Sequence, residues 1–146
     1  MRYHWLFRPL RLIRLAWRHD PTCLTFSAAD ALVLAHTMLV PHELSDRDER
    51  MWASVATVPL AALLGAAGPA GSGGGMAWVR DTVARMDSVE PDDQAWEEAQ
   101  ARCRQSHAVP SSITAHHESV RRLDPRQRRS ITAILVSAAR NYAGRR

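Results

Sequence analysis

Apolar residues recur at helical spacing along almost the whole of this chain, and no stretch alternates apolar with polar residues as a half-buried strand does. The chain has 146 residues, which is the size of one domain with a single core. Its hydrophobic share of 46% and charged share of 23% are typical of globular proteins, so we expect it to fold. The pattern predicts an all-α bundle of about five to seven helices, with a basic amphipathic N-terminal segment over residues 1–20 and an all-α domain over residues 21–146.

Two helices are predicted in the first half of the all-α domain. Ser27 and Asp30 form an approximate capping box that starts the first helix, and we expect this helix to end before Pro41. The second should begin at Ser45, where the following acidic residues suit the positive end of the helix dipole. Pro59 should bend or break it one turn earlier, because proline removes a backbone hydrogen bond.

The second predicted helix contains the longest apolar run of the chain, Ala53–Ala67. This run is shorter than the roughly 20 residues that span a bilayer, so we expect a buried helix. It leads into the sequence GAAGPAGSGGG, residues 65–75, which we expect to be a flexible, non-helical connection. The glycine run lacks the Gly-Lys-Ser/Thr ending of a phosphate-binding loop and follows a helix where such a loop follows a strand.

Helical spacing continues through the second half of the chain. Three predicted helices carry the apolar stripes Met76, Val79, Val83 and Met86, then Trp96, Ala99 and Cys103, then Ile113, His116, Val120 and Leu123. The last helix has Asp124 as cap, Pro125 in its first position, Gln127 closing a capping box, and a stripe of Ile131, Ile134, Leu135, Ala138 and Tyr142. The residues that we expect to be almost fully buried are Trp52, Leu60, Leu63, Ile131, Ile134 and Leu135.

No motif in the chain indicates catalysis. Cys23 and Cys103 are isolated, which argues against a disulfide framework or a structural zinc site. The triplet His116, His117, Glu118 lacks the Glu-x-x-His spacing of carboxylate-bridged iron sites, and we expect His116 on the apolar stripe with the other two facing solvent. We therefore expect a protein that is not an enzyme, uses no cofactor or metal, and neither binds nor hydrolyses ATP.

Charge is unevenly distributed along the chain. All 19 basic residues are arginine, against 15 acidic residues, and the net charge is +4. Most of the carboxylates fall between residues 43 and 98, whereas both ends are basic. The candidate site for DNA phosphates or an acidic partner consists of the arginines that flank the last predicted turn: Arg121, Arg122, Arg126, Arg128 and Arg129. We expect these side chains to project outward together; the alternative is a solvated face of two helices.

A family resemblance rests on the order of several segments. FRPLRLI at residues 7–13 is followed by SAADALVLAHTMLVP, RDERMWASVATVPLAALLGAA, GGMAWVRDTV and RQRRSITAILVSAARNY. In this order they resemble the all-alpha domain of TraG-like type IV coupling proteins, the membrane-anchored ATPases that feed DNA and relaxase into conjugative secretion channels. Actinobacterial members would match the arginine-only composition. Arg8 departs from the asparagine that is usual in the family, and the family's phosphate-binding loop and acidic magnesium-binding motif are not among these residues.

The resemblance implies a non-catalytic substrate-recognition module. Its implied partners are a relaxase or other secreted protein, DNA phosphates, and the ATPase core of a coupling protein. The implied location is the cytoplasm, including the cytoplasmic face of the inner membrane.

Two alternatives come from the residues themselves. One is a small helix-turn-helix regulator in which Arg126, Arg128 and Arg129 lie in the first turn of a recognition helix. The other is a membrane-surface protein that uses residues 5–18 as an interfacial helix, with Trp5 and Trp17 at the level of the headgroups.

Overall fold

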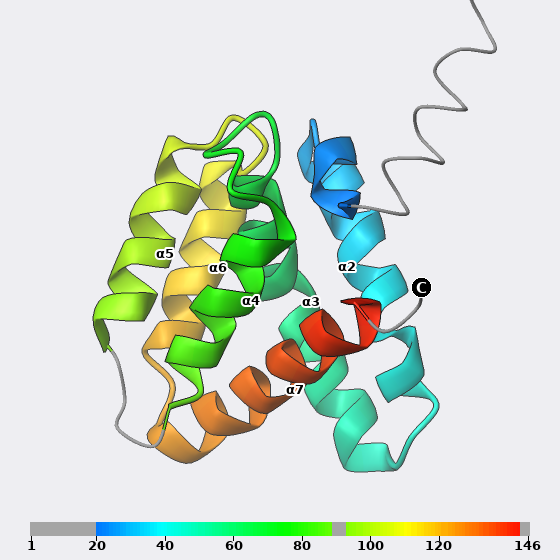
Figure 1. The fold of residues 1–146 in the computed structure, drawn as a ribbon. Coiled ribbons are helices and arrows are strands. Elements are labelled where there is room, and N and C mark those ends of the chain that lie inside the picture. Colours follow the sequence, from blue (N-terminus) through cyan, green and yellow to red (C-terminus); the bar gives the residue numbers. More distant parts are fainter. Residues whose placement is uncertain (1–19, 89–92, 144–146) are drawn as a thin grey trace, which may run out of the picture.

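The computed structural model describes residues 20–88 and 93–143 and is entirely helical within them (Figure 1). The elements are a short 3-10 helix, η1 (Pro21–Leu24), and the α-helices α2 (Ala28–Glu43), α3 (Arg47–Ala67), α4 (Gly75–Met86), α5 (Asp93–Gln105), α6 (Ser111–Arg121) and α7 (Pro125–Ala143). The predicted all-α bundle is confirmed. The predicted basic N-terminal segment lies outside the described residues, except for Asp20.

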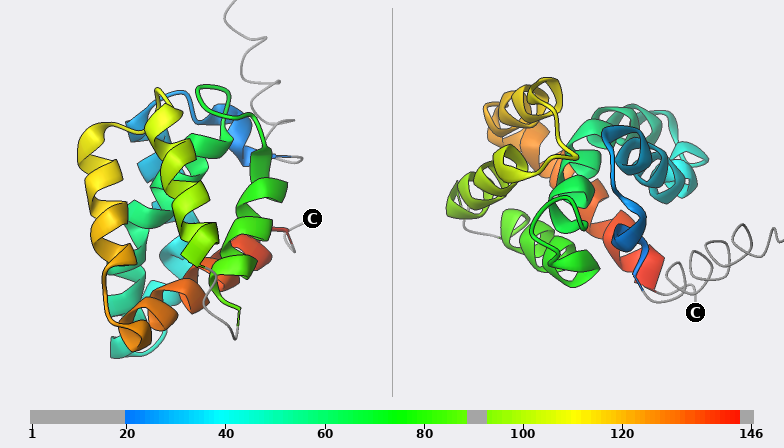
Figure 2. Two further views of the ribbon diagram at one scale, coloured as in Figure 1. Left: turned by 90° about the vertical axis from the view of Figure 1, so that its left-hand side faces the viewer. Right: turned by 90° about the horizontal axis from the view of Figure 1, so that it is seen from above.

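Helix α3 is the centre of the bundle. It packs against α2, α4, α5, α6 and α7, and against η1. Figure 1 shows α2 on one side of α3, α5 and α6 on the other, and α7 across one end; the two views in Figure 2 agree. The burial predicted for Ala53–Ala67 is confirmed, because Ala53, Ala56 and every residue from Pro59 to Ala67 are buried.

By length and composition, α3 is also the one helix in the described part of the chain that could cross a membrane. However, 61% of its most apolar stretch is buried inside the bundle. A core helix of this kind passes the same test, so the bundle itself accounts for the apolar character of α3.

The predicted start of α2 is confirmed and its predicted end is wrong. The Ser27 hydroxyl accepts a hydrogen bond from Asp30 N at 3.2 Å, and the Asp30 carboxylate accepts one from Ser27 N at 3.1 Å. The helix then continues through Pro41 to Glu43. Proline costs the helix only one hydrogen bond so near its end, and His42 beyond it is buried against the bundle.

Helix α3 starts at Arg47, two residues after the predicted start at Ser45, and does not break at Pro59. Asp46, rather than Ser45, is the cap, and its carboxylate accepts from Glu49 N at 2.8 Å. Pro59 lies inside the helix and is itself buried. A proline in a helix interior costs about 3 kcal/mol. Burial of the large side chains on the next turns, such as Leu60 and Leu63, offsets that cost.

The glycine-rich run is an ordered loop rather than a free connection, and its first three residues complete α3. Ser72 donates to the Ala66 carbonyl from its backbone N at 2.8 Å and from its hydroxyl at 3.0 Å. His107 N, from the loop before α6, donates to the Ala70 carbonyl at 3.1 Å. The prediction of a flexible segment is therefore wrong: the Ser72 bonds close the loop locally onto the end of α3, and the His107 bond comes from a residue distant in the sequence.

Asp20 attaches the start of the described chain to this loop. Its carboxylate accepts from Thr22 N at 3.0 Å and from Met76 N, in the first turn of α4, also at 3.0 Å. Gly75 has a φ of 68° and a Cβ there would meet the Asp20 carboxylate, so glycine is required for this approach. Asp20 thus caps both η1 and α4.

Five of the six residues predicted to be almost fully buried are buried: Leu60, Leu63, Ile131, Ile134 and Leu135. Trp52 is only partly buried, although it packs against the same core. Trp52 lies in the second turn of α3, where one side of the helix is exposed, whereas Trp96 is enclosed by the core.

Candidate functional site

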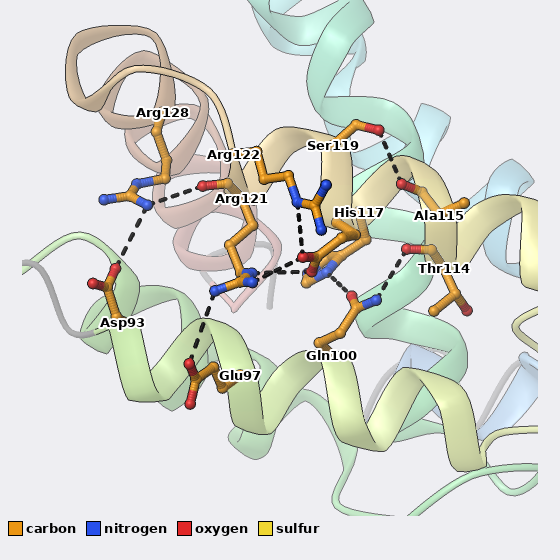
Figure 3. A network of polar contacts seen from close by, with 11 residues as sticks. Asp93, Glu97, Gln100, Thr114, Ala115, His117, Ser119, Arg121, Arg122 and Arg128 are labelled. Carbon is orange, nitrogen blue, oxygen red and sulfur yellow. Dashed lines mark hydrogen bonds and ion pairs between the residues drawn. The ribbon is translucent and has the colours of Figure 1, made fainter.

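The five candidate arginines lie around the turn between α6 and α7, but they do not behave as one group. Figure 3 shows that Arg121 and Arg128 point toward α5, where Glu97 and Asp93 face them. The prediction that all five project outward together is therefore wrong for these two. The physical reason is that the first half of α5 brings carboxylates against the C-terminal end of α6 and the start of α7.

Glu118 binds two of the arginines. Arg121 donates from Nε and Nη2 to the two Glu118 oxygens at 3.0 and 2.8 Å, and Arg122 donates from Nε at 3.2 Å. The hydrogen bonds from Arg121, with its charge and that of Arg122, lower the pKa of Glu118 to about 2. Glu118 therefore stays ionised at neutral pH, and Arg121 is held in a bidentate pair.

Arg128 joins three helices. Its side chain is only 17% exposed, and Nη1 donates to the Arg121 carbonyl at the end of α6 at 3.0 Å. The same Nη1 lies 3.6 Å from Asp93 Oδ1 in the first turn of α5. Arg128 therefore satisfies a carbonyl at the end of α6, and this position makes it part of the scaffold of the turn.

The remaining three arginines, Arg122, Arg126 and Arg129, are exposed. The Arg122 side chain is 75% exposed, despite its single bond to Glu118. Within residues 20–88 and 93–143, neither Arg126 nor Arg129 has a carboxylate within ion-pair distance. We refer to Arg122, Arg126 and Arg129 as the open arginines.

Arg128 and Arg129 also line a small cleft between the end of α4, α5 and the first turns of α7. Its volume is about 30 Å³, close to that of one water molecule. The Thr132 hydroxyl below it lies 3.0 Å from Asp87 Oδ1 and 3.0 Å from the Arg129 carbonyl. The cleft is therefore too small to enclose a nucleotide.

The histidine pair on α6 is oriented opposite to the prediction. His117 is completely buried beside the Trp96 ring, whereas His116 is exposed. Glu118, predicted to face solvent, is mostly covered by its arginine partners, with 18% of its side chain exposed. The helix turns Ile113, His117 and Val120 inward, and spacing alone could not separate this set from one containing His116.

Gln100 makes the burial of His117 possible. Its Nε2 donates to the Thr114 carbonyl at 3.2 Å, so its Oε1 faces His117 Nδ1 at 2.6 Å. Nδ1 must then carry the proton, and the buried Nε2 has no hydrogen-bond partner in the described part of the protein. Burial lowers the pKa of His117 to about 4, so the ring is neutral at pH 7.

Cys103, unlike the partly exposed Cys23, lies inside the bundle. Cys103 is buried, as predicted, and its thiol donates to the Ala62 carbonyl at 3.5 Å. Burial raises its pKa to about 12, so it is not a nucleophile at neutral pH. The described residues contain no cluster of three His, Cys, Asp or Glu side chains that could hold a metal ion.

Sequence reasoning missed the acidic residues that define the site. Asp93, Glu97 and Glu118 divide the arginines into scaffold and open groups, and Gln100 provides the partner of His117. For Glu118 the sequence does carry a signal, since it precedes Arg121 and Arg122 by three and four residues on one predicted helix. Asp93 and Glu97 lie at the start of the predicted helix that carries Trp96, and the sequence does not indicate which helix they would face. Comparison of the chain with protein-family models, with curated proteins and with solved structures finds no match.

Proposed function

We propose that the chain is a non-catalytic interaction module that binds DNA phosphates through the open arginines, Arg122, Arg126 and Arg129. The observation that carries this proposal is the exposure of these three side chains on one interhelical turn. Glu118 pairs with Arg122, whereas Arg126 and Arg129 have no carboxylate partner among the described residues. Exposed guanidinium groups at one corner suit the oxygens of a polyanion, since each group can donate two hydrogen bonds to one phosphate.

The scaffold of this corner also favours binding. Arg121 and Arg128 tie the turn to α5 through Glu97, Asp93 and the bidentate pair with Glu118. The backbone that carries Arg126 and Arg129 is further fixed by Asp124, whose Oδ1 accepts from Arg126 N at 2.9 Å and from Gln127 N at 3.1 Å. Binding therefore needs little ordering of the backbone, which lowers its entropic cost.

The resemblance to the all-alpha domain of type IV coupling proteins supplies the biological setting of the proposal. In that setting the module acts in the cytoplasm, including the cytoplasmic face of the inner membrane, and contacts a relaxase or other secreted protein together with its DNA. The ATPase core of a coupling protein is the further partner that the resemblance implies. Carboxylates on the relaxase or on another secreted protein would bind the same open arginines in place of DNA phosphates.

The helix-turn-helix reading is less well supported by the packing. Helix α6 packs mainly against α3 and α5, whereas α7 packs mainly against α2, α3 and α4. Two helices of a DNA-reading motif are expected to pack on each other as one unit. Arg128, one of the three arginines that this reading assigns to base contacts, is bound to the Arg121 carbonyl and lies near Asp93. Phosphate binding without base reading fits the open arginines better.

Fluorescence anisotropy of a labelled DNA duplex over a salt series tests the proposal. We expect weak binding that depends little on sequence and falls steeply with salt. Changing the three open arginines together to Gln should lower the slope of log K against log[salt] by about 3 units, at about 0.9 per phosphate contact.

The matched control is a triple change of exposed arginines elsewhere: Arg47→Gln, Arg50→Gln and Arg104→Gln. This variant loses the same net charge as the variant of the open arginines. It therefore separates direct contacts between the open arginines and DNA phosphates from the general attraction of a positively charged protein to DNA. An equal loss of slope in both variants would contradict a site at the α6–α7 turn. Tight binding to a single sequence would instead favour the helix-turn-helix regulator.

A further inference from the structure

The large apolar side chains exposed on the described part of the protein gather in one region. They are Phe26, Val33, Val40, Leu44 and Met51. Val33 and Val40 lie on α2, Leu44 is its C-cap residue, Phe26 precedes the helix, and Met51 lies in the second turn of α3. Scattered exposed apolar residues are common, whereas several of them along one helix and its ends mark a candidate interaction surface.

Three of these side chains form a stripe on α2. Val33, Val40 and Leu44 are spaced by seven and four residues, so they follow one line along the outer side of the helix. Val33 is 66% exposed and Leu44 is 83% exposed. Helix α2 packs against α3, α7 and η1, and it lies at the edge of the bundle (Figures 1 and 2). We call Val33, Val40 and Leu44 the α2 stripe.

An apolar hollow adjoins the α2 stripe at its N-terminal end. It lies between η1 and α2 and is lined mainly by Pro21, Leu24, Ala29, Val33 and Leu34. Its volume of about 260 Å³ is several times that of a water molecule, which leaves room for a large apolar side chain. Stripe and hollow together place apolar side chains at both ends of α2, with the exposed polar residues His36 and Thr37 between Val33 and Val40.

Asp30 lines the hollow, and further acidic residues lie close to the stripe in the sequence. Asp30 and Glu43 lie on α2 itself, and Asp46, Asp48 and Glu49 follow it at the start of α3. Only two arginines, Arg47 and Arg50, lie among them. The occupant that suits such a surface has an apolar stripe of its own and a positive charge.

The chain contains one segment with these properties, residues 5–18. Leu6, Leu10, Ile13 and Trp17 recur at the spacing of a helical face. Residues 1–19 carry five arginines and no acidic residue. The segment also leads directly to the hollow, because Trp17 precedes Pro21 by four residues, a span of about 14 Å at most.

We propose that the α2 stripe and the adjoining hollow are the docking site of the chain's own residues 5–18. The apolar positions of the segment match the stripe and the hollow in kind, and its arginines are opposite in charge to the carboxylates nearby. Asp20, bonded to Thr22 and Met76, fixes the end of the tether beside the hollow. A tether this short gives the segment a millimolar effective concentration, so docking within one chain prevails over docking between chains.

Thiol protection in the full-length chain tests the proposal. In a Cys23→Ser background, Val33→Cys places a thiol on the α2 stripe, and Ala133→Cys places one on an exposed position of α7. Alkylation by iodoacetamide is followed by mass spectrometry. We expect the thiol at position 33 to react about tenfold more slowly than the thiol at position 133. This ratio corresponds to a docked state that holds about 90% of the molecules, because only the undocked tenth exposes the thiol to the reagent.

Two further variants identify the occupant. Leu10→Glu with Ile13→Glu should restore fast alkylation at position 33, because it removes the apolar face of the segment. Arg11→Lys with Arg14→Lys changes the same two turns, keeps the charge and should preserve the protection. Circular dichroism checks that each variant folds.

Two outcomes would overturn the proposal. One is alkylation at position 33 that is as fast as at position 133 in the unaltered segment. The other is protection that disappears over about a hundredfold dilution, since that dependence belongs to contact with a second copy of the chain.

Discussion

At the scale of the residue, His117 illustrates how one buried polar group depends on a partner that sequence spacing cannot reveal. The apolar spacing of α6 is compatible with either His116 or His117 facing inward. Gln100 favours His117, because its Oε1 accepts a hydrogen bond from His117 Nδ1 at 2.6 Å. The Trp96 ring, 5.3 Å away between centroids, covers the imidazole. The result is a neutral histidine with an unsatisfied Nε2 inside the bundle.

This burial makes the stability of the fold depend on pH. The pKa of His117 is lowered from 6.5 to about 4, chiefly by burial, so the unfolded chain binds a proton more readily than the folded one. The free energy of unfolding therefore has its full value above pH 6.5 and decreases as the pH falls toward 4. The decrease due to His117 is at most on the order of 3 kcal/mol. Urea unfolding between pH 7 and pH 4.5 should therefore show a falling free energy of unfolding, and His117→Asn should flatten that fall.

The exposed neighbour provides the control for this prediction. Asn at position 117 can still donate to the Gln100 oxygen, whereas His116→Asn changes a solvent-facing residue of the same helix. The pH dependence should persist in His116→Asn. The pKa of Glu118 is lowered from 4.5 to about 2, so most of its own loss of stabilisation falls below pH 4.5, and the small part above that pH is common to both variants. If His116→Asn reduced the pH dependence of the free energy of unfolding as much as His117→Asn does, His117 would not be the source of that dependence.

At the scale of the element, the helix starts were largely predictable and the proline positions were not. Ser27 and Asp124 act as caps because their side-chain oxygens reach backbone N–H groups two or three residues later, a purely local interaction. Pro41 and Pro59 also have a local effect, but burial of the surrounding helix outweighs it. Local chemistry thus predicts an element where tertiary contacts do not oppose it.

The cap of α7 gives a direct test of this local contribution. Asp124→Ala removes the acceptor for Arg126 N and Gln127 N and should lower the free energy of unfolding by about 1 kcal/mol. Asp124→Asn keeps an oxygen at the same place and should lose only a few tenths of a kcal/mol. Urea denaturation at neutral pH measures both, and an equal loss in the two variants would show that charge rather than capping matters there.

At the scale of the whole molecule, the sequence predicts the fold class better than the candidate site. Apolar periodicity depends on which residues face the core, so it predicts the helices and five of the six core residues. The division of the arginines depends on α5 lying against α6 and on Asp93 reaching Arg128. No local pattern encodes that arrangement, because its partners are separated by more than 20 residues in the sequence.

The central position of α3 predicts that the bundle unfolds as one unit. Leu63 is fully buried on the helix that contacts every other helix of the described chain, so Leu63→Ala should cost on the order of 2 to 5 kcal/mol. Arg104→Ala changes an exposed residue and should alter stability by about 0.5 kcal/mol at most. Urea unfolding followed by circular dichroism and by tryptophan fluorescence should give coincident transitions in both variants. Separate transitions in Leu63→Ala would show instead that the helices on the two sides of α3 unfold independently.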